Sequence, residues 1–326
     1  MHPQIAEDMK LVSQILHREG CIKNLRIVGE DECLIPEGGK QLRPHLVVLA
    51  ARLCGYSGTA HIDYAVAIEL IHNATLFHDD VIDSADIRRG KETLNIRHGN
   101  SFAILAGDYV MARSFGIIAK YKNPELFSMI TDCVGNLVIG QMREMDYERN
   151  LNCTVDVFLD IIDNKTASLI ATCLLVGGQI AAANNSTLNL LKEIGMKTGR
   201  LFQIADDVID YLGTEGETGK KRFQDVKEGK ITLPAILLAQ RCLPQERDLF
   251  QSMLGKPEIS GSEGDTIMAL LEKYEIIKSI YDEYFSNHQD IDRLIDEFSG
   301  SEFYADFKEL IGLITGRLDK YVSRSF

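Results

Sequence analysis

Apolar residues recur at intervals of three and four through almost the whole chain, whereas alternating runs of β-branched residues are scarce. These intervals match the 3.6-residue turn of an α-helix, so the pattern predicts a nearly all-α protein. With 326 residues and 45% hydrophobic content, the chain can bury a sizeable core. No domain boundary stands out, and we predict a single domain over residues 1–326.

Two copies of Asp-Asp-Val-Ile-Asp each end an apolar helical stretch, one at residues 79–83 and the other at residues 206–210. In each copy the first and last aspartates are four residues apart, so their carboxylates lie on one helix face. A single copy on a helix is usually a solvated acidic face. Two copies that end apolar helices favour a polyvalent cation between them, because three neighbouring carboxylates repel one another without one.

The type of ligand narrows the choice of metal ion. Carboxylate oxygens favour Mg²⁺ or a similar hard ion over zinc, and Mg²⁺ usually completes its coordination with water and substrate phosphate oxygens. The two copies arose either from an old duplication or independently, because both bind ligands of the same chemistry. The predicted ligands are Asp79, Asp80, Asp83, Asp206, Asp207 and Asp210.

Charge and cysteine content restrict the class of protein. A formal charge of -13 argues against a general nucleic-acid or anionic-membrane binder, because such proteins attract phosphate with a net basic surface. Any phosphate bound by this protein must therefore be bound by a local group of basic residues. Seven scattered cysteines without a CxxC pair suit reduced thiols in the cytosol. The N-terminus lacks a signal-peptide pattern, and a buried helix explains the uncharged run 166–191 better than a membrane span does. We predict a cytoplasmic protein without a transmembrane segment.

Basic residues stand where phosphate could bind. Lys40 and Arg43 follow a pair of glycines and precede Pro44, which fits the first turn of a helix. A helix N-terminus of this kind binds anions. The alternative is a glycine-rich turn with incidental surface charges.

Further candidates lie close to the first aspartate copy or at the start of an apolar helix. Arg88 and Arg89 follow that copy in a polar loop, where they are either solvated or placed for the oxygens of a diphosphate. His72, two turns before Asp79, is either a core histidine or a ligand. Lys165 begins an apolar stretch in a helix predicted over residues 155–183, where packing alone would not require a lysine.

We also predict a loop over residues 255–265. Residues 213–230 are glycine-rich and charged, which suits either a linker or a loop that closes over a site.

Taken together, these segments resemble the trans-isoprenyl diphosphate synthase family, and its long-chain octaprenyl and heptaprenyl type in particular. The resemblance covers residues 36–235 and departs from the family at Gln41, where arginine is common, and at Phe223, where glycine is common. The segments that carry it are Gly39-Lys-Gln-Leu-Arg-Pro44, Leu76–Asp83 with Arg88-Arg89-Gly90, Lys165-Thr166, Phe202–Asp210 and Gly229-Lys-Ile-Thr-Leu-Pro234.

The resemblance implies an all-α isoprenoid synthase helical bundle around a deep central cavity, usually a homodimer. About three Mg²⁺ ions would bridge an allylic diphosphate, farnesyl or geranyl, to the aspartates. The resemblance assigns isopentenyl diphosphate to Lys40, Arg43, His72 and Arg89, and the allylic diphosphate to Arg88, Lys165, Thr166, Gln203, Lys220 and Lys230. It gives the catalytic role to Asp79, Asp80, Asp83, Lys165, Asp206, Asp207 and Lys230. Product release would allow transient membrane contact.

Product length can be predicted from helix geometry. Ala74 and Thr75 precede Asp79 by five and four residues and so lie about one turn deeper, at about 1.5 Å of rise per residue. Neither side chain is aromatic, so a growing prenyl tail would pass this level. We predict a long-chain product suited to a quinone side chain, with a geranylgeranyl diphosphate synthase as the close alternative.

Two other readings remain. A class I terpene cyclase would share the first aspartate copy but does not need Lys40, Arg43 and Arg89. A non-catalytic subunit of a hetero-oligomer would be expected to have lost aspartates, and both copies are intact.

Overall fold

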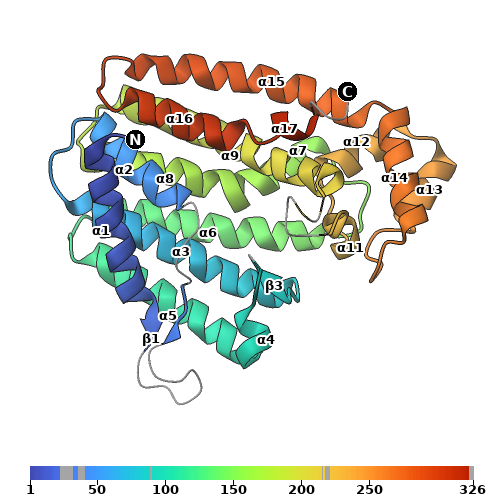
Figure 1. Cartoon of the computed structure of the whole chain (residues 1–326), viewed down its shortest axis with the longest axis horizontal. Coiled ribbons are helices and arrows are strands. Elements are labelled where there is room, and N and C mark those ends of the chain that lie inside the picture. Colours follow the sequence, from blue (N-terminus) through green and yellow to red (C-terminus); the bar gives the residue numbers. More distant parts are fainter. Residues whose placement is uncertain (23–31, 36–40, 89, 215, 217–220, 323–326) are drawn as a thin grey trace. The chain divides into compact units, whose positions relative to one another are not determined.

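The computed structural model of the chain describes residues 1–22, 32–35, 41–88, 90–214, 216 and 221–322. Within these residues the protein is all-α, as the apolar spacing predicts, and the strands form two short antiparallel hairpins (Figure 1). Cys21 of β1 (Cys21–Ile22) pairs with Cys33 of β2 (Glu32–Cys33). In the second hairpin, β3 (Ile87–Arg88) pairs with β4 (Lys91–Glu92).

Helices make up most of the described chain. Those before residue 150 are α1 (Pro3–Gly20), α2 (Leu42–Leu53), α3 (Ala60–Ile82), α4 (Leu94–His98), α5 (Asn100–Ala119) and α6 (Pro124–Asp146). Those after it are α7 (Val155–Ile162), η1 (Asp163–Ala167), α8 (Ser168–Ile180), α9 (Asn185–Leu212), α11 (Gln224–Glu228), α12 (Leu233–Arg241), α13 (Pro244–Gln251), α14 (Gly261–Lys273), α15 (Ile276–Ile295), η2 (Asp296–Phe298), α16 (Tyr304–Thr315) and α17 (Asp319–Val322).

The chain forms two compact units, each built from segments that are not contiguous in sequence. The first unit contains residues 1–134, 170–192 and 298–310, and the second contains residues 135–169, 193–297 and 311–326. Each aspartate copy belongs to a different unit. The prediction of one domain over the whole chain therefore stays a prediction.

The core of the first unit is built around α3, which packs against α1, α2 and α5. Side chains on nearly all sides of α3 are buried, among them Val66, Leu70, Ile71 and Phe77. A helix that is apolar all round becomes enclosed by its neighbours. This explains why the carboxylates at its C-terminal end are held at a partly buried position rather than on a free surface.

By length and composition alone, α5 is apolar enough to cross a membrane. It packs along α3 and α4, and Ala103, Gly107 and Val110 on it are buried. A core helix meets the same length and composition test. The small residues on the buried side allow the close approach to α3.

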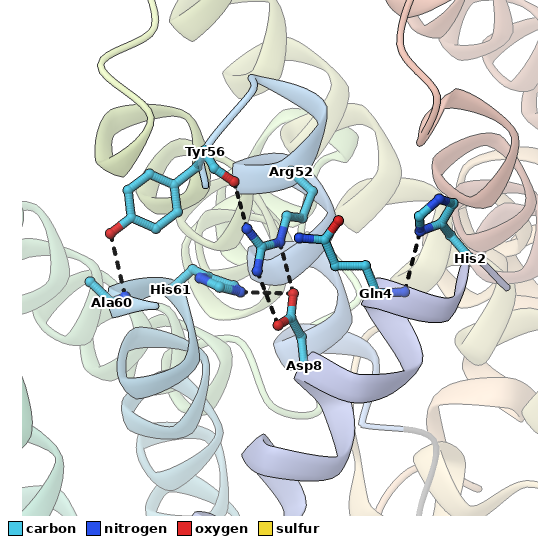
Figure 2. A network of polar contacts seen from close by, with 7 residues as sticks. All are labelled: His2, Gln4, Asp8, Arg52, Tyr56, Ala60 and His61. Atoms are coloured by element: carbon cyan, nitrogen blue, oxygen red, sulfur yellow. Dashed lines mark hydrogen bonds and ion pairs between the residues drawn. The ribbon is translucent and has the colours of Figure 1, made fainter. Parts of the chain in front are cut away.

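A buried polar network fastens α1 to α2 and α3 (Figure 2). The Arg52 guanidinium donates two hydrogen bonds to the Asp8 carboxylate, at 2.8 and 3.0 Å, and a third to the Tyr56 carbonyl at 2.6 Å. His61 Nε2 lies 3.0 Å from Asp8 Oδ2. Asp8 and Arg52 are 5% and 6% exposed, and His61 is fully buried. Because both groups are buried, the Asp8 carboxylate and the Arg52 guanidinium each need the opposite charge of the other to be stable inside the protein.

We expect Asp8→Ala to lower the free energy of unfolding by about 3–5 kcal/mol, because the variant leaves the Arg52 guanidinium buried without its counter-charge. Urea denaturation followed by circular dichroism measures this change. Glu7→Ala removes an exposed carboxylate from the adjacent position and is expected to change the free energy by less than about 0.5 kcal/mol. Equal effects of the two substitutions would contradict the role given to the network.

The same network predicts how stability depends on pH. Burial lowers the pKa of His61 below its ordinary value of 6.5, despite the neighbouring Asp8. Burial raises the pKa of Asp8, but hydrogen bonds from Arg52 and His61 outweigh it and hold this pKa below 3.8. The unfolded chain therefore binds both protons at a higher pH than the folded chain. The free energy of unfolding should fall as pH drops below about 6.5, and again below about 4.

In the second unit, α12 packs against α7, α14 and α15. Phe223, just before α11, has a φ of 63°, a left-handed conformation that glycine adopts more easily. The ring is buried, lies edge-on to Tyr211 and carries the Arg222 guanidinium 5.1 Å above its centroid. Packing thus compensates for the departure from glycine at this position.

Two expectations for single elements need correction. The helix predicted over residues 155–183 is interrupted by a π-helical turn, η1, at Asp163–Ala167. The loop predicted over residues 255–265 ends early, because α14 begins at Gly261 with a capping box between Ser260 and Glu263. Local hydrogen bonds between cap and backbone decide this boundary.

Candidate functional site

The first aspartate copy ends α3. Asp79 and Asp80 lie in its last turn, and Asp83 is its C-cap residue, whose backbone N–H donates to the Asp79 carbonyl at 2.8 Å. Asp80 is 4% exposed, whereas Asp79 and Asp83 are partly exposed. The helix therefore presents three carboxylates within one turn, as the spacing predicts.

Arg88 holds one of these carboxylates in place. Its Nε donates to Asp80 Oδ1 at 2.6 Å, from the first hairpin strand after the helix. A charge-assisted bond of this length is stronger than a hydrogen bond between neutral groups. The polar loop after the first copy thus folds back onto it, and Arg88 is not simply solvated.

Arg43 and His72 meet across α2 and α3. Arg43 Nη1 lies 2.9 Å from His72 Nε2. Because a guanidinium can only donate, Nε2 accepts and the His72 proton lies on Nδ1. Two residues that the resemblance assigns to isopentenyl diphosphate are therefore brought together. Lys40, Arg89 and Lys220 lie outside the described residues, and their roles stay predictions.

The chain-length residues lie one turn before Asp79 on α3. Ala74 is fully buried. Thr75 is partly exposed, and its hydroxyl donates to the His72 carbonyl at 2.8 Å within the same helix. The limit that these side chains place on the product stays a prediction.

The second aspartate copy lies near the end of α9. Gln203 Nε2 donates to Asp207 Oδ1 at 2.8 Å, and its carbonyl oxygen accepts from the Thr166 hydroxyl at 2.8 Å. Asp210 accepts the backbone N–H groups of Gln224 and Asp225, both at 3.1 Å. The second copy is thus oriented by Gln203 of its own helix, which Thr166 of η1 holds, and by the backbone of Gln224 and Asp225.

Asp207 is the most enclosed carboxylate of this cluster. Its exposed fraction is 4%, and its Oδ2 is buried without a hydrogen-bond partner among the described residues. Burial raises its pKa well above the ordinary value, and the nearby carboxylates of Asp206, Glu144 and Asp210 raise it further, against the Gln203 hydrogen bond. A buried carboxylate oxygen without a partner, amid like charges, is the arrangement that a bound cation stabilises.

Asp207 also lines a small cavity in the second unit. Glu144, Gln203 and Lys230 line the polar side, and Phe158 and Ile161 are among the apolar residues that line the rest. Lys230 Nζ is held by Glu228 at 2.7 Å. The cavity thus combines an acidic cluster, a partly exposed amine and an apolar wall.

The π-helical turn η1 places Lys165 and Thr166. A Cβ added to Gly140 of α6 would lie 2.5 Å from the Lys165 backbone nitrogen, and one added to Gly199 of α9 would lie 2.4 Å from Ala167 Cα. The turn is therefore packed tightly between these two helices, which only glycine permits. Arg200 adds two hydrogen bonds to the Asp163 carboxylate, at 2.5 and 2.6 Å.

Three residues that contact the candidate site were not predicted from the sequence. Glu144 accepts a 2.5 Å bond from Lys165, and the signal for it was the need of that lysine for a partner. Asp225 is partly exposed, but desolvation of its carboxyl raises its pKa, and Asp210 and Asp207 raise it further. Arg317 donates to Asp206 at 2.7 Å and lies over the Phe202 ring at 4.6 Å. No sequence pattern pointed to Asp225 or Arg317.

Comparison with known proteins identifies the family of the chain. A family model described as polyprenyl synthetase matches residues 32–271. Octaprenyl diphosphate synthase of Escherichia coli strain K12 is 32% identical over 68% of this chain and 68% of its own length. Geranylgeranyl diphosphate synthase of Saccharolobus solfataricus is 32% identical over 74% of this chain and 75% of its own length.

The fold agrees as well. A crystal structure of a polyprenyl synthase from Caulobacter crescentus CB15, complexed with calcium and isoprenyl diphosphate, matches with a TM-score of 0.87 and 27% identity over 96% of this chain and 95% of that one. The family model covers well over half of the chain. The chain therefore belongs to the polyprenyl synthetase family and is a trans-prenyltransferase with the isoprenoid synthase fold.

Proposed function

We propose that this enzyme condenses isopentenyl diphosphate with an allylic diphosphate, farnesyl or geranyl, and makes a long-chain polyprenyl diphosphate suited to a quinone side chain. The observation that carries the proposal is the cluster around Asp207. In it, a buried carboxylate, the Gln203–Thr166 pair and the Lys230 amine converge beside an apolar wall. This combination fits the diphosphate and the first carbons of an allylic substrate.

The acidic clusters fit divalent metal ions, and we propose Mg²⁺, about three per site. The proposed ligands are Asp79, Asp80, Asp83, Asp206, Asp207 and Asp210. When bound, these ions would neutralise the charge of the allylic diphosphate as it leaves. The calcium in the Caulobacter structure supports a divalent ion in this fold.

The side chains of the chain itself carry out the remaining work. Lys165, Lys230 and Arg88 donate to the oxygens of the departing diphosphate, which stabilises the charge that develops as the allylic C–O bond breaks. Each of these cations is paired with a carboxylate of its own unit, Glu144, Glu228 and Asp80 respectively, which orients its side chain.

Arg43 and His72 hold the diphosphate of isopentenyl diphosphate, and Lys40 and Arg89 are proposed to join them. The double bond of that substrate attacks the allylic carbon and forms the new C–C bond. A proton is then lost from the condensed product, and the released diphosphate accepts it.

The long product is proposed from Ala74 and Thr75, since neither side chain is large enough to stop a growing tail. A geranylgeranyl product is the second candidate, favoured by the similarity to the Saccharolobus enzyme. The two candidates differ only in where the apolar path for the tail ends.

We also propose a homodimer. Large apolar side chains are exposed on α5, at Ile104, Leu105 and Tyr109, and separately on α6, at Ile139 and Met142. A second copy of the chain would bury such side chains. Light scattering of the purified protein would show twice the chain mass.

We place the enzyme in the cytoplasm, where its seven thiols stay reduced.

Product analysis tests the proposed function. The purified protein is incubated with Mg²⁺, isopentenyl diphosphate and farnesyl diphosphate, and the products are dephosphorylated and sized by mass. We expect a series of products that ends well beyond geranylgeranyl. A clean stop at geranylgeranyl would establish the second candidate instead. No elongation at all would favour a non-catalytic subunit.

A further inference from the structure

A group of soft metal ligands lies at the end of α1, in the first unit and apart from the aspartate copies in sequence. The group consists of His17, Cys21 and Cys33. Cys21 follows His17 by four residues, directly after the last residue of the helix. Cys33 stands opposite Cys21 in the antiparallel pairing of β1 with β2. The helix end and the strand pairing therefore fix the positions of all three residues relative to one another.

The ligand atoms already lie close together. The Cys33 sulfur is 3.4 Å from His17 Nδ1, and the three ligand atoms all lie within 4.8 Å of one another. In a tetrahedral zinc site, with Zn–S near 2.3 Å and Zn–N near 2.0–2.1 Å, neighbouring ligand atoms are about 3.5–3.8 Å apart. The sulfur–nitrogen distance of 3.4 Å is close to this range, and small side-chain rotations would bring in the second sulfur.

One backbone atom helps to gather the two thiols. The Cys21 thiol donates to the His17 carbonyl at 3.0 Å, and the Cys33 thiol donates to the same oxygen at 3.4 Å. Both S–H groups therefore point into one small region beside the imidazole. Loss of the two thiol protons would leave two thiolates there, which a divalent ion would neutralise.

The chemistry of these ligands selects the ion. Two thiolates and an imidazole nitrogen suit zinc and similar soft divalent ions, whereas Mg²⁺ prefers oxygen. Both cysteines are partly exposed and His17 is exposed, so an ion can enter from solvent and a water can take the fourth position. This site and the carboxylate clusters would therefore bind different metals.

We propose that His17, Cys21 and Cys33 form a site for Zn²⁺ or a similar soft divalent ion, which fastens the end of α1 to β2. The ion would join the end of the helix to Cys33, which lies twelve positions after Cys21 in the chain. Such a cross-link would stabilise the folded protein in the presence of the ion, because the unfolded chain does not hold the three ligands together.

Cobalt substitution tests the site in the full-length protein. Excess Mg²⁺ is present to occupy carboxylate sites, the thiols are kept reduced, and Co²⁺ is added stepwise. Co²⁺ bound by thiolates gives an intense sulfur-to-metal charge-transfer absorption, which carboxylate sites do not give. We expect this absorption to reach its limit at about one equivalent and to be abolished by added Zn²⁺, which binds such ligands more tightly.

Matched variants locate the signal. Cys21→Ser and Cys33→Ser should each remove most of the absorption, and His17→Gln should weaken Co²⁺ binding at least about tenfold. Cys242→Ser makes the same change at another partly exposed cysteine and should leave the absorption unchanged. Absorption that survives in the double variant Cys21→Ser/Cys33→Ser would overturn the proposal, and so would its absence in the unaltered protein.

A second measurement needs no variant and so does not depend on the folding of the altered chains. The unaltered protein is treated with an alkylating reagent with and without Zn²⁺, and peptide mass spectrometry locates the modified cysteines. We expect Zn²⁺ to protect Cys21 and Cys33 but not Cys242. Equal alkylation of the reduced protein with and without Zn²⁺ would refute metal binding.

Discussion

The double variant Asp79→Ala/Asp206→Ala is expected to lose turnover by on the order of 10³-fold or more, while it keeps its helical fold. Each substitution removes one carboxylate from a separate cluster, so each weakens a proposed set of metal ligands. Asp206 is half exposed, and its pair with Arg317 is of the kind that contributes at most about 1 kcal/mol to stability. The loss should therefore appear in catalysis rather than in folding.

Initial rates of isopentenyl diphosphate incorporation, measured over a range of Mg²⁺ concentrations, test this prediction. Circular dichroism shows whether the helical content is retained. Asp86→Ala provides the control, because it removes an exposed carboxylate from the loop just after the first copy. Its rate should stay close to that of the unaltered enzyme. Full activity of the double variant would sink the metal proposal.

Thr75→Phe is expected to shorten the main product to geranylgeranyl or less. Thr75 lies four residues before Asp79, which is about 6 Å along the helix at about 1.5 Å per residue. Its hydroxyl bonds only to the His72 carbonyl of its own helix in the described structure, and the side chain is partly exposed. A phenyl ring can therefore be added here and would block the path of the growing tail.

Sizing the dephosphorylated products by mass, after incubation with isopentenyl and farnesyl diphosphates, gives the result. Thr75→Val is the matched control, since it keeps the size of the side chain and should leave the product length unchanged. Ala74→Phe is a poorer test, because Ala74 is fully buried and a larger side chain there would cost about 1–3 kcal/mol by overpacking. An unchanged product from a folded Thr75→Phe variant would refute the argument from depth.

Much of the fold could be predicted from the sequence, because helices depend on local spacing. The predicted helix end at Asp83 coincides with the C-cap of α3, and the helix whose first turn was expected at Pro44 is α2, which begins at Leu42. The π-helical turn at Lys165 was not predicted. It depends on how closely Gly140 and Gly199 let their helices approach, and no local pattern reports that distance.

The two hairpins were missed for a related reason. Their strands are only two residues long, too short to show the alternation by which a strand is recognised. Cys21 and Cys33 looked like scattered thiols in the sequence. Only the pairing of β1 with β2 places them beside one another and beside His17.

The sequence by itself determined the family, the all-α fold and the positions of the carboxylates, because each rests on short segments whose local pattern can be recognised along the chain. The tertiary structure decided which partners these residues meet. Glu144 reaches Lys165, and Arg317 reaches Asp206, although each pair is far apart along the chain. Such contacts depend on which helix faces pack together. That choice follows from burial of the whole core and cannot be read from any single segment.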